Sequence, residues 1–326
     1  MRENGVVRQL LPETVKNLFD DIVYQRVLGA SKHIFMIGQM IEAIAKEGKE
    51  NGAPIDKVVD DILTVSKFFI ETRGEASQAI SNAINMMVKD IALVKKMDLE
   101  DGIKQIISKK DSYAALAKES LDLVVNYSVK AAESMEKIMV FDYSSTVDQF
   151  LKKMKREDRD LTVVIPESRS IDGGHAFVKT CLEVGHKVKF IPDAAIMYFL
   201  KECDGAFIGA ETFFPDGTVF NTTGSDLVGL VCSEFKIPLY VLTPLIKVDI
   251  RPVYGYKKVL VENDLSERLA SNWKEEERGN VDFICPELLG VDPKYITAVI
   301  TEKGIIPARQ LFNVSVGYSK ELKGDV

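Results

Sequence analysis

Residues 204–230 read DGAFIGAETFFPDGTVFNTTGSDLVGL. The apolar run 206–208 is bounded by glycines and predicts a strand that is buried on both faces. Glu211 follows at the kind of strand end where open α/β sheets bind ligands. Residues 221–225 read as a loop of small and capping residues before a helix, whose first N–H groups suit a phosphate or carboxylate. These features indicate a small phosphorylated ligand, and the alternative is an ordinary strand, turn and helix cap.

The length of 326 residues exceeds what one compact core normally holds and favours two domains. A content of 46% hydrophobic and 28% charged residues is typical of a globular protein. Because no apolar run has the length of a membrane helix and the first residues lack a secretory apolar stretch, we expect a cytoplasmic protein that does not contact a membrane. The net charge of −7 argues against direct nucleic-acid binding.

The sequence predicts neither a metal site nor a cofactor. Its four cysteines lack CxxC spacing, so they are expected to be reduced thiols, and its three histidines share no metal-ligand spacing. No strand-linked GxGxxG and no GxxxxGK is present, which argues against a standard dinucleotide or P-loop site.

Residues 1–134 have the pattern of a helix bundle. Apolar residues recur at helical spacing over residues 15–23, 34–44, 58–63 and 80–91, and a further helical pattern covers residues 113–132. Polar breaks that contain glycine lie at residues 50–52 and 100–102. We therefore predict a helical N-terminal domain over residues 1–134.

From residue 135 to residue 326 short apolar runs alternate with helical patterns. Strands are predicted at residues 138–141, 161–165, 187–191, 206–208 and 239–242, with helices between them, whereas residues 295–300 fit a strand or a helix. This alternation predicts an α/β domain with a mainly parallel sheet and right-handed crossovers. The strongly charged segment 262–280 is expected on its surface.

Polar side chains follow each predicted strand of this domain. They are Asp142, Ser144 and Ser145 after the first strand, Glu167 and Arg169 after the second, Asp193 after the third, Glu211 after the fourth, and Lys247 shortly after the fifth. In a parallel sheet these ends converge on one edge. Hydroxyls, an arginine and a helix start there could hold a phosphate, and carboxylates could bind sugar hydroxyls or move protons. For any one residue the alternative is structural, such as Ser144 as a helix cap or Arg169 paired with Glu167 or Asp172.

Ordered sequence blocks resemble the family that unites the regulatory subunits of initiation factor 2B with methylthioribose-1-phosphate and ribose-1,5-bisphosphate isomerases. The blocks are LGAS at Leu28, ETRGEASQAISNAI at Glu71, IMVFDYSSTVDQFL at Ile138, PESRSIDGG at Pro166, IPDAAIMYFL at Ile191, GAETFFPDGTVFNTTGS at Gly209, IPLYVLTPLIKVD at Ile237 and ITAVITEKGIIP at Ile296. The resemblance spans nearly the whole chain. It implies a helical N-terminal domain, a Rossmann-like C-terminal domain, a homodimer formed through the latter or a higher homo-oligomer, and a sugar-phosphate or nucleotide pocket between the domains.

The resemblance also implies site residues. Matches to positions of the family pocket are Arg73, Ser144, Ser145, Arg169 and Lys247. The isomerases carry a cysteine after the first sheet strand and an aspartate in a Gly-Ala-Asp motif after the fourth, and here Asp142 and Glu211 fall at these positions. Two cations of the family pattern are lost as well, at Thr222 and Leu28.

These departures leave three functional hypotheses. We expect a phosphorylated-metabolite binding protein of the regulatory kind, because initiation-factor subunits likewise lack the cysteine and some carry the glutamate. In it Arg73, Ser144, Ser145, Arg169 and the helix start at Gly224 and Ser225 hold the anion. Asn221 and Glu211 meet hydroxyls, and Lys247 adds charge or braces the loop. The alternative is an active aldose–ketose sugar-phosphate isomerase with Glu211 and Asp142 as acid and base, since neighbouring carboxylates separate their pKa values. A third is a structural subunit with an empty pocket.

Overall fold

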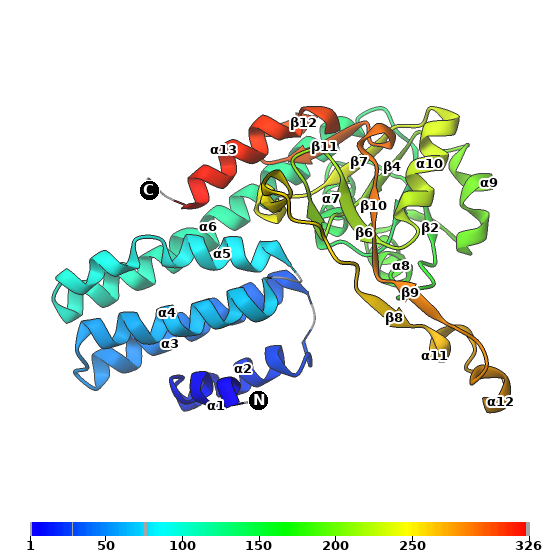
Figure 1. Cartoon of the computed structure of the whole chain (residues 1–326). Coiled ribbons are helices and arrows are strands. Elements are labelled where there is room, and N and C mark those ends of the chain that lie inside the picture. Colours follow the sequence, from blue (N-terminus) through cyan, green and yellow to red (C-terminus); the bar gives the residue numbers. More distant parts are fainter. Residues whose placement is uncertain (1, 28, 75–76, 324–326) are drawn as a thin grey trace. The chain divides into compact units, whose positions relative to one another are not determined.

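The computed structural model describes residues 2–27, 29–74 and 77–323, and the chain divides into two compact units (Figure 1). The helical unit comprises the chain up to Glu119, the short segment Ile246–Val248 and the chain from Gly317 onward. The sheet unit comprises Ser120–Leu245 and Asp249–Val316. A domain boundary between residues 134 and 135 stays a prediction.

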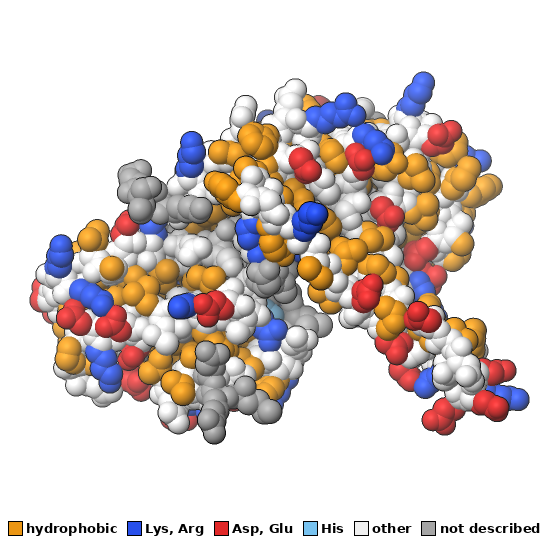
Figure 2. Space-filling model, in the orientation of Figure 1, with side chains coloured by type: hydrophobic (Ala, Val, Ile, Leu, Met, Phe, Trp, Pro, Cys, Tyr) orange, Lys and Arg blue, Asp and Glu red, His pale blue; other side chains and the backbone are white. Residues whose placement is uncertain are grey.

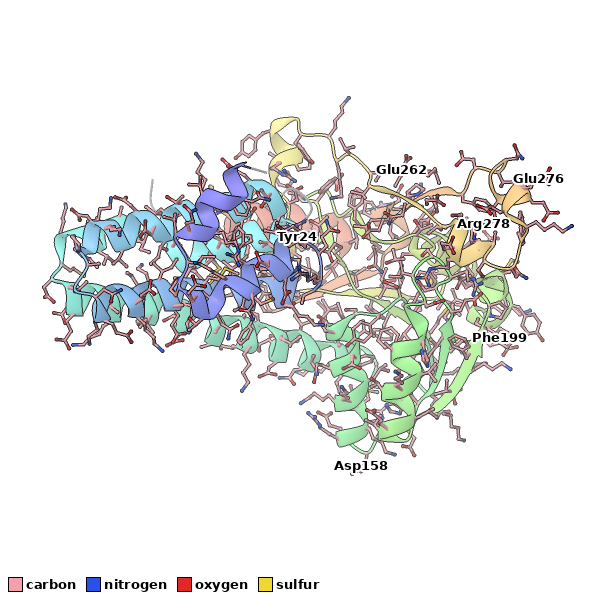
Figure 3. All side chains as sticks on the ribbon, turned by 90° about the horizontal axis from the view of Figure 1, so that it is seen from below. Tyr24, Asp158, Phe199, Glu262, Glu276 and Arg278 are labelled. Carbon is pink, nitrogen blue, oxygen red and sulfur yellow. The ribbon has the colours of Figure 1, made fainter. Side chains whose placement is uncertain are left out.

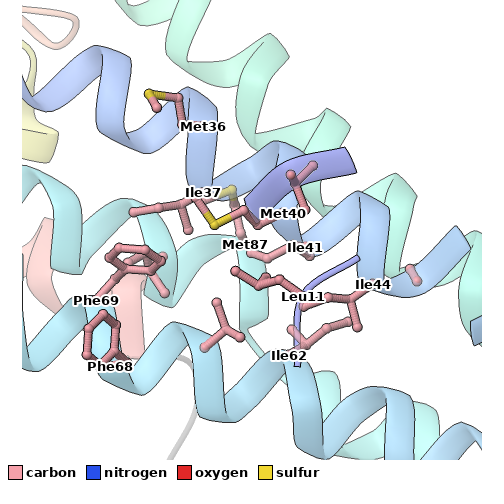
Figure 4. Close-up of a cluster of buried hydrophobic side chains, with 14 of the residues drawn as sticks. Leu11, Met36, Ile37, Met40, Ile41, Ile44, Ile62, Phe68, Phe69 and Met87 are labelled. Carbon is pink, nitrogen blue, oxygen red and sulfur yellow. The ribbon is translucent and has the colours of Figure 1, made fainter. Parts of the chain in front are cut away.

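The helical unit is built from α-helices whose apolar stripes are buried. They are α1 (Arg2–Gln9), α2 (Lys16–Val23), α3 (Ala30–Glu50), α4 (Ile55–Arg73), α5 (Gln78–Val88), the first part of α6 (Leu99–Ala131) and the end of α13 (Leu311–Lys323). Figure 4 shows part of its core, where Ile37 of α3 and Ile62 of α4 are fully buried. Phe19 of α2 packs on Phe68 and Phe69 of α4, with ring centroids 5.3 and 5.5 Å apart. The helical period of the sequence therefore identified the core-facing sides.

The predicted break at residues 100–102 is wrong, because these residues form the first turn of α6. The side chain of Asp98 accepts a hydrogen bond from the backbone N–H of Asp101 at 3.0 Å, and acidic residues are favoured at a helix N-terminus. Gly102 serves packing, since a Cβ there would lie 2.7 Å from Cδ1 of Ile55.

Neither α6 nor any other helix in the described part of the chain is long and apolar enough to span a membrane.

The sheet unit is an α/β domain with a mainly parallel sheet, as predicted. Its seven strands are β1 (Lys137–Phe141), β2 (Thr162–Pro166), β3 (Lys187–Ile191), β4 (Gly205–Ile208), β7 (Leu239–Leu242), β11 (Ala298–Thr301) and β12 (Gly304–Ile306). Helices α7 (Ser145–Arg156), α8 (Gly174–Val184), α9 (Ile196–Leu200) and α10 (Ser225–Phe235) alternate with them. The ambiguous stretch 295–300 ends in strand β11, which pairs with β7.

The strand order is β12-β11-β7-β4-β1-β2-β3, and only β12 runs antiparallel to its neighbour. The six parallel strands, numbered along the chain, therefore have the order 3-2-1-4-5-6 of a Rossmann fold, and the order reverses between β1 and β4. Phe141 of β1 pairs with Ile208 of β4, so Asp142 and Gly209 leave the sheet at the same level. Ligands of such sheets bind at this reversal point.

A small antiparallel sheet corrects the loop predicted at residues 221–225. It consists of β5 (Thr212–Phe213), β6 (Val219–Thr222) and β10 (Leu288–Val291). Asn221 and Thr222 are the last residues of β6 and pair with Leu289 and Leu288 of β10. Because this partner strand lies far along the chain, the local run of polar residues gave no sign of the pairing.

The charged segment 262–280 is largely exposed, as expected, and belongs to an arm that projects from the rest of the sheet unit (Figure 1). The arm contains the hairpin β8 (Glu262–Asp264) and β9 (Ile284–Pro286) with the short helices α11 (Ser266–Leu269) and α12 (Glu275–Arg278). Acidic and basic side chains gather at its tip in Figure 2, and Figure 3 labels Glu276 and Arg278 there.

Candidate functional site

Asp142 lies at the end of β1, where its side chain is held by hydroxyl groups from two other segments. Thr222 Oγ1 donates to Asp142 Oδ2 at 2.7 Å, and Ser168 Oγ donates to Asp142 Oδ1 at 3.1 Å. The residue is 4% exposed, and its backbone is left-handed with φ of 56°. One carboxyl group at the end of β1 is thus hydrogen-bonded both to the end of β6 and to the loop after β2.

Burial raises the pKa of the Asp142 carboxyl above its ordinary value. The hydrogen bonds from Thr222, Ser168 and the Tyr143 backbone oppose this effect because they favour the charged form, and the charge of Asp193 adds to the rise. Desolvation is the largest of these contributions. Both oxygens are engaged and almost inaccessible to solvent, so this carboxyl group is placed for a structural role.

Glu211 is in a different environment at the end of β4. Its backbone N–H donates to the carbonyl of Phe220 at 2.9 Å and continues the β5–β6 pairing. Its side chain is half-buried, and its carboxylate forms no hydrogen bond or ion pair with any residue that the structure describes. The two carboxyl groups of the predicted catalytic pair therefore differ, since that of Asp142 is hydrogen-bonded at both oxygens and that of Glu211 has no such partner among the described residues.

The start of α7 lies against the end of β4. Ser144 is the N-cap residue of α7 and Ser145 is its first residue, which is exposed. A Cβ on Gly209 would lie 2.5 Å from Cβ and Oγ of Ser144, so only glycine permits this approach. The Ser144 hydroxyl makes no capping hydrogen bond within the described residues, although its carbonyl accepts the N–H of Asp148 at 2.8 Å.

The start of α10 lies against the end of β1. Gly224 is its N-cap residue with φ of 106°, and a Cβ there would lie 2.6 Å from Cζ of Phe141. Asn221 Nδ2 donates to Ser225 Oγ at 3.0 Å, and both residues are buried. Helices α7 and α10 thus both begin beside the reversal point of the sheet. Helix N-termini carry partial positive charge and N–H donors, and this arrangement suits an anion.

Arg169 follows β2, but its guanidinium group contacts the arm. The backbone N–H groups of Ser168 and Arg169 donate to the carboxylate of Asp193 at 2.9 and 2.7 Å. Arg169 Nη2 donates to the carbonyl of Arg268 in α11 at 3.0 Å. Of the two acidic partners considered for it, Glu167 lies 4.0 Å away, whereas Asp172 pairs with Arg268.

Arg73 and Lys247 belong to the helical unit. Arg73 Nη2 donates to the carbonyls of Ile22 and Val23 at 2.7 Å each, so the cation caps the C-terminal end of α2. Burial lowers the pKa of this guanidinium group. Lys247 ends the 3₁₀ helix η4 (Leu245–Lys247) and is half-buried. Leu28 lies outside the described residues.

The sequence did not identify Ser168 and Thr222 as partners of Asp142. Thr222 stands 80 positions from Asp142 and Ser168 stands 26 positions away. Both occur in the recognised blocks, yet a single hydroxyl residue has no pattern that names its partner. Their meeting depends on the order of strands in the sheet, which brings these ends together.

Comparison with known proteins gives a consistent family. The sequence model of the initiation factor 2 subunit family matches residues 30–308. An eIF-2B subunit 2-like protein of Pyrococcus furiosus is 26% identical over 310 residues, which cover 93% of this chain and 100% of the relative. A ribose 1,5-bisphosphate isomerase of Thermococcus kodakarensis is 22% identical over 307 residues, which cover 93% and 92%.

Solved structures share the fold. The 5-methylthioribose 1-phosphate isomerase of Pyrococcus horikoshii has a TM-score of 0.77 at 18% identity, over 95% of this chain and 92% of that chain. A translation initiation factor eIF-2B of the same species has a TM-score of 0.72 at 22% identity, over 91% and 98%. The resemblance inferred from the sequence blocks is confirmed.

Proposed function

Because the chain belongs to the initiation factor 2 subunit family, which includes sugar-phosphate isomerases and eIF2B-like subunits, we propose that it binds a phosphorylated metabolite without converting it. The metabolite is a sugar phosphate or a nucleotide. This assigns the chain to the regulatory side of its family.

The hydrogen bond between Thr222 and Asp142 carries this proposal. These are two of the positions at which the chain departs from the isomerase pattern, and the two departures contact each other directly. A carboxyl group stands at the position of the thiol, and a hydroxyl group that satisfies it stands at the position of the cation. With both oxygens of Asp142 engaged and buried, Glu211 has no accessible acid–base partner in it.

The ligand site in this proposal is centred on the starts of α7 and α10. Backbone N–H groups there, including the helix start at Gly224 and Ser225, receive the phosphate together with the hydroxyls of Ser144 and Ser145. Ligand hydroxyls are met by Asn221 and by the Glu211 carboxylate. The proposal also assigns ligand-binding roles to three cations, because they match positions of the family pocket: Arg73, Arg169 and Lys247.

A thermal-shift series on the whole chain tests the binding. The compounds are ribose 5-phosphate, ribose 1,5-bisphosphate, adenosine monophosphate and inorganic phosphate. A ligand at a hundred times its dissociation constant stabilises the folded state by about 2.7 kcal/mol, which is measurable. We expect a sugar phosphate or nucleotide to stabilise the protein and NMR to show no conversion of it. Absence of any stabilisation would favour the structural-subunit hypothesis.

One observation favours the alternative of an active isomerase, namely the free carboxylate of Glu211 in the described structure. Aldose–ketose conversion that is abolished in Glu211→Gln, while binding persists, would establish this alternative. Conversion that survives the substitution would exclude Glu211 as the catalytic group.

We also propose that the chain forms a homodimer or a higher homo-oligomer, since a related eIF2B-beta2-delta2 complex is tetrameric. Sedimentation equilibrium measures this directly. A monomer at all accessible concentrations would refute it.

A further inference from the structure

The side chain of Asn82 is hydrogen-bonded to the backbone on both sides of Lys247. It lies on α5, is 9% exposed, and its Nδ2 donates to the carbonyls of Ile246 and Val248 at 2.9 Å each. All four residues belong to the helical unit. A side-chain amide has two N–H donors on one nitrogen, so one asparagine can satisfy two carbonyls.

The segment that Asn82 holds is only three residues long and is fixed at both ends in the sheet unit. On one side, the N–H of Leu245 donates to the carboxylate of Glu302 at 2.9 Å. On the other side, the N–H of Asp249 donates to the carbonyl of Phe213 at 2.9 Å. Asp249 is fully buried, and its carboxylate accepts hydrogen bonds from Nε and Nη2 of Arg251 at 2.9 Å each. The backbone is thus held at Ile246 and Val248 and at the two residues that flank the segment.

We propose that Asn82 is a positioning residue for Lys247, because it fixes the backbone from which the ammonium-bearing side chain extends. A lysine side chain is long and flexible, and ordering it costs conformational entropy. Fixing the carbonyls before and after Lys247 holds its Cα in place, so the side chain always extends from the same point. The role of Lys247 toward a ligand rests on the proposed function, whereas the hold of Asn82 on the segment does not.

The first test measures the reactivity of Lys247 without any ligand. Asn82→Asp has nearly the same size, but it presents acceptors to the two carbonyls and has no N–H donor. Acetylation with acetic anhydride, followed by mass spectrometry, gives the rate at Lys247 relative to the exposed Lys118. Losing two hydrogen bonds should raise this ratio about tenfold, because the segment opens more often.

The matched control is Asn85→Asp, an exposed position on the same helix, which should leave the ratio unchanged. If Asn82→Asp does not fold, Asn82→Ala removes the same donors without adding charge. A folded Asn82 variant with an unchanged Lys247 ratio would overturn the proposal.

The second test uses ribose 5-phosphate as the probe in thermal-shift titrations. We expect Asn82→Asp and Lys247→Ala each to weaken binding about tenfold, and the double variant to be no weaker than Lys247→Ala alone. Additive losses would overturn the proposal, because Asn82 would then act independently of Lys247. If wild-type protein shows no stabilisation by the probe, the proposed function fails, and the acetylation result alone decides the role of Asn82.

Discussion

Asp142 and Thr222 are 80 residues apart in the sequence, and 2.7 Å separates their Oδ2 and Oγ1 atoms. The pair joins the end of a central parallel strand to the end of a strand in the small antiparallel sheet. In a buried environment such a bond has to be formed, because an unpaired polar group there costs about 1–3 kcal/mol.

The raised pKa of Asp142 predicts a pH dependence of stability. In the unfolded chain the pKa of this carboxyl group is near 3.8. A carboxyl group whose pKa is higher in the folded chain stabilises the fold fully below the unfolded value, and this stabilisation is lost as pH rises through the folded pKa. Asparagine does not titrate. The free energy of unfolding of Asp142→Asn minus that of wild type should therefore increase from about pH 4 to about pH 8.

Denaturant titrations at a series of pH values measure this difference. Asp158→Asn is the matched control, because Asp158 has the same φ of 56° but is exposed. It reports what an Asp→Asn exchange does at this φ on the surface, and the Asp142→Asn difference is compared with it at each pH. A constant difference for Asp142→Asn would show that burial does not perturb this carboxyl group.

Thr222→Val keeps the shape of the side chain and removes its hydroxyl donor. We expect a loss of about 1–3 kcal/mol in the free energy of unfolding, because Asp142 Oδ2 loses its partner in a buried site. Urea unfolding of this variant, of Asp142→Asn and of the double variant forms a thermodynamic cycle. The two effects should be strongly non-additive, and additive effects would contradict a direct coupling.

Gly224→Ala tests the contact between the start of α10 and β1. The added Cβ would lie 2.6 Å from the Phe141 ring in a backbone with φ of 106°. Gly255→Ala is the control, since its φ of 89° is equally unfavourable for alanine but nothing lies within 4 Å. Thermal unfolding should show Gly224→Ala less stable than the control by about 1–3 kcal/mol, the usual cost of overpacking. Equal losses would mean that backbone strain alone acts.

Thiol reactivity should separate Cys285 from the other three cysteines. Burial raises the pKa of Cys181, Cys203 and Cys232 to about 12, so their thiolate forms are scarce at neutral pH. Cys285 lies half-buried on the arm strand β9. A colourimetric disulfide reagent should therefore modify only Cys285 in the folded protein and all four cysteines after unfolding. Rapid modification that persists in Cys285→Ser would contradict the burial of the others.

Much of the fold could be predicted because its signals are local. The predicted strands at residues 187–191 and 239–242 coincide with β3 and β7, and helix α8 lies between the second and third predicted strands, as expected. In each, the side-chain period or the apolar run lies within a few residues. The polar residues that follow the strands indicated which edge of the sheet carries the candidate site, and the sequence blocks indicated the family.

By itself, then, the sequence determined the α/β class, the alternation of strands and helices, and the residue types at the strand ends. Only the tertiary structure decided that Asp142 is satisfied by Thr222 and Ser168, that Arg169 reaches the arm, and that Asn82 holds the segment around Lys247. The physical reason is that backbone preferences and periodicity act over a few neighbouring residues. The pairing of polar groups depends on strand order and on packing between segments up to 166 residues apart. No local sequence pattern indicates which groups will pair.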